Sequence, residues 1–249
     1  MQQSSDRDQH CQRDVQSYLT LRRYTIGAEP SFVLNAMHMD LPDAVVNHPT
    51  LKRLEDLATD MIILGNDIVS YDREQSQPGQ AEHNIISAAM SSHNLDVQGA
   101  MDWVGELHDG LVDEFLGLYA RLPQKFPEET EQTNAYAKEY ANALANWVRA
   151  SDAWGFESER YFGRDAPRVG RERTFTLRPQ PQTQDSDQWA AQEVAIAPEP
   201  ETLKQEEQRQ QHQHQAVVNP AKVLTISSMW TRAWKFLGWV LKKAGIGIF

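Results

Sequence analysis

Between Val15 and Gly163, apolar residues recur every three or four positions, and this spacing restricts the fold more than any other feature of the chain. One such stripe consists of six small or apolar residues: Leu51, Leu54, Ala58, Met61, Gly65 and Ile68. Residues with this spacing lie on one face of an α-helix. The same region shows no sustained alternation of apolar and polar residues, which half-buried strands would require. The pattern therefore predicts an all-α domain.

Proline and glycine divide this region into about five helices joined by short connections. Breaks or ends are expected at Gly27, Pro30 and Pro78. The predicted helices cover 15–26, about 49–75, 84–92, 96–122 and 131–154, with a further short helix after Pro30. Helices with short connections pack in layers around one apolar core.

Composition changes after Gly163. Residues 164–222 contain six prolines and eleven glutamines, and such a segment cannot bury enough apolar surface to offset the entropy of ordering it. The final residues, 227–249, place tryptophans and leucines on one helical face and basic residues largely on the other, which resembles an interfacial amphipathic helix. Weak contact with a membrane surface, docking onto the globular part and a non-native tail are the open alternatives. The expected organisation is a tail over 1–14, a helical domain over 15–163, a disordered linker over 164–222 and an amphipathic apolar segment over 223–249.

Charge and cysteine content exclude several classes of protein. The net charge of −11 argues against a nucleic-acid partner, because such a surface needs a concentrated basic patch. Cys11 is the only cysteine, so neither an internal disulfide nor a thiolate metal site can form. The N-terminus shows no secretory signal, and no apolar run is long enough to span a bilayer. We therefore expect a cytoplasmic protein.

The predicted helix over 49–75 carries a set of polar residues with metal-ligand character. Asn66, Ser70 and Glu74 stand four residues apart, which places them on one face over two turns. Their amide, hydroxyl and carboxylate oxygens are hard ligands that can fill part of a magnesium shell. A solvated polar face is the alternative. Ile63 continues the same face as an apolar residue, and this favours the wall of a cavity.

The string from Asn66 to Glu74 resembles the N-D-x-x-S-x-x-x-E magnesium motif of class I terpene cyclases, in the version of fungal sesquiterpene synthases. Two further segments agree in the same order. Arg23 and Gly27 match the R-x-x-x-G pattern of the family's diphosphate-sensing helix break. The Arg160-Tyr161 pair, preceded by Trp154, matches the closing segment. The resemblance covers about residues 15–163 and corresponds to the C-terminal half of such an enzyme.

The resemblance implies a partial class I terpenoid synthase fold and a lyase reaction. Its cofactor would be Mg²⁺, held by Asn66, Ser70 and Glu74. Its substrate would be an isoprenyl diphosphate, with farnesyl diphosphate preferred, which is ionised to a carbocation with release of diphosphate. Gly27 would act as the effector of the sensing break, and Trp154 would face the carbocation. The side chains expected to contact the diphosphate are Arg23, Arg73, Arg160 and Tyr161.

One expected motif does not occur in this sequence. The resemblance implies a D-D-x-x-D string on an earlier helix, where it would bind further magnesium ions, and the chain contains no such string. We therefore expect an incomplete enzyme, with a non-catalytic fragment or interaction protein as the alternative. A chain-elongating prenyltransferase of the same fold would be expected to show a second aspartate-rich motif. The presence of Asn66, Ser70 and Glu74 instead argues against that class.

Overall fold

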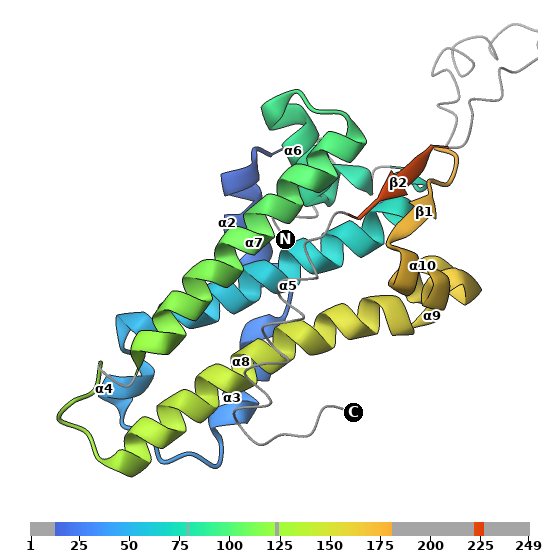
Figure 1. Ribbon diagram of the computed structural model, residues 1–249. Helices are drawn as coiled ribbons and strands as arrows, with labels where there is room; N and C mark the ends of the chain where they lie inside the picture. The colour runs from blue at the N-terminus through green and yellow to red at the C-terminus, as the bar shows by residue number, and fades with distance from the viewer. Residues whose placement is uncertain (1–12, 79, 123–124, 181–221, 227–249) are drawn as a thin grey trace, which may run out of the picture.

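The computed structural model describes residues 13–78, 80–122, 125–180 and 222–226. This part of the chain is almost entirely helical, and the prediction of an all-α domain is confirmed (Figure 1). The α-helices are α2 (Val15–Thr25), α3 (Ala28–Ala36), α4 (Asp43–Val46), α5 (Pro49–Gln75), α6 (Ile85–His93), α7 (Val97–Arg121), α8 (Glu131–Glu157), α9 (Glu159–Phe162) and α10 (Ala166–Glu172). Two short 3-10 turns, η1 (Ala81–His83) and η3 (Gly163–Asp165), connect some of them.

Helix α5 is the central element, and the long helices α7 and α8 both pack along it (Figure 1). Every residue from Leu57 to Gly65 is buried, as expected for a helix segment that is apolar on most of its surface. Two hydrophobic clusters share α5. Leu51 and Leu54 belong to the cluster with α3 and α8, while Ile63 and Ile68 belong to the cluster with α6 and α7. The second cluster supports the end of α5 that carries the motif.

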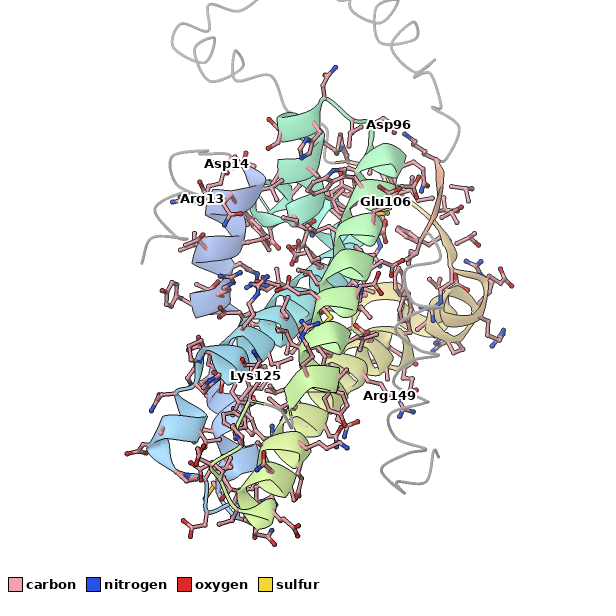
Figure 2. The ribbon with its side chains drawn as sticks, turned by 60° about the vertical axis from the view of Figure 1, so that its left-hand side comes forward. Arg13, Asp14, Asp96, Glu106, Lys125 and Arg149 are labelled. Atoms are coloured by element: carbon pink, nitrogen blue, oxygen red, sulfur yellow. The ribbon has the colours of Figure 1, made fainter. Side chains whose placement is uncertain are left out.

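Side-chain caps explain where several helices begin. At the start of α2, Asp14 accepts a hydrogen bond from the backbone N–H of Ser17 at 3.0 Å. At the start of α7, Asp96 accepts one from Gly99 at 2.8 Å. Figure 2 shows these two carboxylates at the same end of the domain. Such caps satisfy N–H groups that the first turn of a helix leaves unpaired.

The predicted break between the first two helices is confirmed at Gly27 but not at Pro30. Gly27 has a φ of 78°, in the left-handed region, and separates α2 from α3. Pro30 lies in the first turn of α3, where its missing N–H breaks no helical hydrogen bond. The helix predicted over 131–154 continues to Glu157.

The expectation of disorder over 164–222 is wrong for residues 164–180. This segment forms α10 and then strand β1 (Thr174–Thr176), which pairs antiparallel with β2 (Val223–Thr225). Phe175 lies opposite Leu224, and both side chains are buried in the cluster with α6 and α7. Strands of three residues are too short to show a period-two pattern, so the sequence offered no sign of them. The expected amphipathic segment over 223–249 begins instead with strand β2, and its residues 227–249 lie outside the described residues, as do residues 181–221 of the expected linker and Cys11.

Among the described helices, none combines the length and the apolar character needed to cross a bilayer.

Candidate metal centre

The three candidate metal ligands lie together near the C-terminal end of α5. Ser70 is buried, and Asn66 and Glu74 are partly buried. The amide nitrogen Nδ2 of Asn84 lies 3.4 Å from Ser70 Oγ and donates to Glu74 Oε2 at 2.9 Å, so both oxygens turn toward the same point. The helical spacing therefore brings the set together as predicted, on a face that is not fully solvated. The metal-binding role itself stays a prediction.

The donor set fits a hard divalent cation. Asn66, Ser70 and Glu74 offer an amide, a hydroxyl and a carboxylate oxygen, which is the chemistry that Mg²⁺ prefers. Within the described residues, no group of three His, Cys, Asp or Glu side chains could hold a metal ion. That finding does not apply to Asn66, Ser70 and Glu74, because only one of the three is a carboxylate. The three oxygens supply part of a six-ligand shell.

Asp67, directly after the first ligand, joins α5 to its neighbours. Its buried carboxylate accepts hydrogen bonds from the hydroxyl of Tyr18 on α2 and, at 3.0 Å, from the backbone N–H of Ile85 at the start of α6. Burial raises the pKa of Asp67 to about 7, although the nearby Arg22 guanidinium opposes this rise. Asp67 thus fixes the orientation of the ligand face, the side of α5 that carries Asn66, Ser70 and Glu74. Asp67 lies within the motif, but its position in the sequence alone does not predict this role.

The two neighbouring arginines of α2 contact different residues of α5. Arg23, the predicted diphosphate sensor, forms two hydrogen bonds of 2.6 Å with the carboxylate of the buried Asp60. Arg22 instead donates to Asn66 Oδ1 at 3.2 Å and lies 3.9 Å from Asp67. The arginine that contacts the ligand face in this structure is therefore Arg22, which sequence reasoning missed. The predicted role of Arg23 is not tested by this arrangement.

The closing segment reaches the same face from α8 and α9. Tyr161 is buried, and its hydroxyl accepts a hydrogen bond of 2.8 Å from Asn66 Nδ2. The guanidinium of Arg160 lies 5.8 Å from the ring centroid of Trp154 and 5.7 Å from that of Tyr161. Trp154 is half exposed and meets Tyr161 edge to face. Arg73 lies on α5 next to Glu74 and is partly buried. The segments carrying the three predicted motifs thus converge, although they are far apart in the sequence.

This arrangement of helices defines a class of protein. The structure matches the crystal structure of germacradien-4-ol synthase from Streptomyces citricolor with a TM-score of 0.52 and 25% identity, over 59% of this chain and 47% of that one. Residues 1–114 match the model of terpene synthase family 2, C-terminal metal binding. The chain is therefore related to the terpene synthases, through the part of these proteins that binds metal.

Fungal relatives agree with this assignment. A Δ(6)-protoilludene synthase of Stereum hirsutum is 47% identical over 179 residues, covering 72% of this chain and 47% of the relative. A Δ(6)-protoilludene synthase of Armillaria gallica is 44% identical over 180 residues, covering 72% of this chain and 51% of the relative. The chain thus spans about half the length of these curated relatives.

Proposed function

We propose that this chain supplies the metal- and diphosphate-binding half of a sesquiterpene synthase that ionises farnesyl diphosphate and releases diphosphate. The observation that carries the proposal is the convergence on one face of α5: Asn66 contacts both Arg22 and Tyr161, next to Ser70 and Glu74. Two further fungal relatives, 38% and 41% identical, are named sesquiterpene synthases, and this supports the choice of a farnesyl substrate. Negative charge develops on the diphosphate as the carbon–oxygen bond breaks, and fixed cations at this position would stabilise it.

Each side chain has a defined task in this proposal. Asn66, Ser70 and Glu74 would hold Mg²⁺, which supplies positive charge to the departing diphosphate. The guanidinium groups, which stay charged and match phosphate oxygens with planar donors, would bind it. The hydroxyl of Tyr161 accepts its hydrogen bond from Asn66, so its own hydrogen can donate to a phosphate oxygen. The proposed diphosphate contacts are Arg22, Arg23, Arg73, Arg160 and Tyr161.

Trp154 is the proposed contact of the carbocation. Half of its surface is exposed, and it lies beside Tyr161, whose hydroxyl contacts Asn66. An aromatic face attracts a cation through its quadrupole, most strongly where water is excluded.

A non-catalytic role is the second candidate, and one observation favours it. Large apolar side chains are exposed at the end of α2 and along α3: Tyr24, Val33, Leu34 and Met37, with exposed fractions between 61% and 80%. Exposed apolar surface of this kind is typical of an interaction site. A chain that only associates through this surface would bind no diphosphate.

A product assay tests the proposal. The purified chain is combined with the separately expressed N-terminal half of the 47% identical relative and incubated with farnesyl diphosphate and Mg²⁺, and the headspace is analysed for sesquiterpene hydrocarbons. We expect product from the combined halves and a loss of about 100-fold or more when this chain carries Asn66→Ala/Glu74→Ala, because two candidate ligands are removed. Glu128→Ala, an exposed carboxylate in the loop before α8, is the control and should retain full activity. Absence of product from two folded halves that bind one another contradicts the catalytic proposal, whereas product from this chain alone would show that it is not incomplete.

A further inference from the structure

The chain returns to α5 directly after strand β1. The backbone N–H of Arg178 donates to Asp72 Oδ1 at 2.7 Å, and Gln75 Nε2 donates to the carbonyl of Arg178 at 2.7 Å. Asp72 and Gln75 are both buried in the last turns of α5. Two main-chain contacts therefore hold residue 178 beside the turns that carry Ser70 and Glu74.

The side chain of Arg178 connects α5 to α9. Its Nε lies 3.2 Å from Asp72 Oδ2, and a terminal nitrogen of the guanidinium donates to the carbonyl of Tyr161 at 2.7 Å. Asp72 lies about 120° around the axis of α5 from Asn66, and therefore on a different face. Tyr161 connects the two faces of α5. Its carbonyl accepts a hydrogen bond from Arg178, and its hydroxyl accepts one from Asn66 at 2.8 Å.

We infer that Arg178 is a positioning residue of the candidate site. By holding the carbonyl of Tyr161 to Asp72, it keeps the Tyr161 hydroxyl against Asn66. A guanidinium suits this task because its planar donors serve two acceptors at once in fixed directions. The inference rests on the proposed function, since Arg178 would act on diphosphate binding only through Tyr161.

The structure also indicates how to remove the bridge without undocking the segment. The main-chain contacts of residue 178 do not need its side chain, so Arg178→Ala should fold and lose only the link between Asp72 and Tyr161. Arg168 is a matched control, with a side chain 38% exposed against 44% for Arg178. Its guanidinium pairs with Asp165 and Glu172, which lie outside α5 and α9.

The first test measures binding of inorganic pyrophosphate to the full chain by calorimetry in the presence of Mg²⁺. We expect Arg178→Ala and Tyr161→Phe each to weaken binding by about 10-fold. If Arg178 acts through Tyr161, the double variant should bind no more weakly than the weaker of the two single variants. Arg168→Ala should bind like the wild type. Unchanged binding in Arg178→Ala, or full additivity in the double variant, would overturn the inference.

The second test does not depend on the proposed function. Amide hydrogen exchange over residues 158–163 is measured in the chain without Mg²⁺ or pyrophosphate. We expect faster exchange in Arg178→Ala than in the wild type and Arg168→Ala, because α9 loses its link to α5. If the wild type binds no pyrophosphate, the proposed function fails and the exchange result alone decides whether Arg178 positions α9. Unchanged exchange in Arg178→Ala would overturn the inference on its own.

Discussion

At the scale of single residues, a few buried polar side chains connect the candidate site to the fold. Asn84 is fully buried and uses both ends of its amide. Nδ2 donates to the carbonyl of Asp67 at 2.7 Å and to Glu74, while Oδ1 accepts from the backbone N–H of Ile86 and so caps α6. Because unpaired buried polar groups are costly, this pairing favours a single orientation of α6 against α5.

His108 should make the stability of the protein pH-dependent. This residue is fully buried in α7, and burial lowers its pKa from 6.5 to about 4, because the charged form is poorly solvated there. Between these pH values the unfolded chain binds a proton that the folded chain does not. The contribution of His108 to stability is therefore complete above pH 6.5 and decreases as the pH falls toward 4, by about 3 kcal/mol in total.

Urea unfolding of the wild type and His108→Gln at pH 7 and pH 4.5 checks this prediction. The free energy of unfolding should fall between the two pH values by about 2 kcal/mol more in the wild type than in the variant. Asp67 contributes with the opposite sign, since its raised pKa makes stability decrease as the pH rises toward 7. That contribution is present in both proteins and cancels. Equal pH dependence in the two proteins would contradict the burial argument.

At the scale of elements, the break between α2 and α3 sets the direction in which α2 approaches the ligand face. Gly27 forms this break in a left-handed conformation with a φ of 78°. Arg22 lies in the last turn of α2 and contacts Asn66, so the geometry of the break and the position of this arginine are linked. Helix ends with a left-handed residue strongly favour glycine, which has no Cβ.

Alanine substitutions at two glycines distinguish the cost of a strained backbone conformation from the cost of a steric clash. A Cβ added at Gly27 or at Gly110 would meet no atom within 4 Å, but only Gly27 has a positive φ. We expect Gly27→Ala to destabilise the protein by about 1–2 kcal/mol. Gly110→Ala, in the interior of α7, should stabilise it by about 0.5–1 kcal/mol. Chemical denaturation of both variants measures the two effects, and a stabilised Gly27→Ala would show that the break is not strained by a side chain.

At the scale of the whole molecule, the strand pair ties a distant part of the chain to the helical core. Strand β2 follows residues 181–221, yet Leu224 and Ile226 are buried in the same cluster as Phe175 and the residues of α6 and α7. Gln98 of α7 donates to the carbonyl of Thr225 at 2.8 Å, which fixes the pair against that helix. Residues 222–226 therefore contribute to the stability of the domain.

Two neighbouring substitutions in β2 test this contribution. Leu224→Ala should destabilise the protein by about 2–5 kcal/mol, because it removes a fully buried side chain from the core. Val223→Ala is the control, since this side chain is 63% exposed, and its effect should stay within about 0.5 kcal/mol. Thermal or urea unfolding distinguishes the two. Equal, small effects would mean that β2 is not part of the cooperative fold.

Local pattern was enough to predict most helices and the ligand face. The predicted helix over 49–75 and the common face of Asn66, Ser70 and Glu74 are confirmed, because residues four apart on a helix share a face whatever the helix packs against. The break at Gly27 was predictable for the same reason, since it depends on the conformational freedom of one residue. Such features are predictable from sequence because a few neighbouring residues determine them.

Contacts between distant residues were decided only by packing. Successive residues on a helix point about 100° apart, so the angle at which α2 crosses α5 selects Arg22 rather than Arg23 for Asn66, which is 44 residues away. The link between Arg178 and Asp72 joins residues 106 apart, and β1 finds its partner only across residues 181–221. None of these pairs has a local signal. Each forms because burial in the common core brings its two partners to the same place.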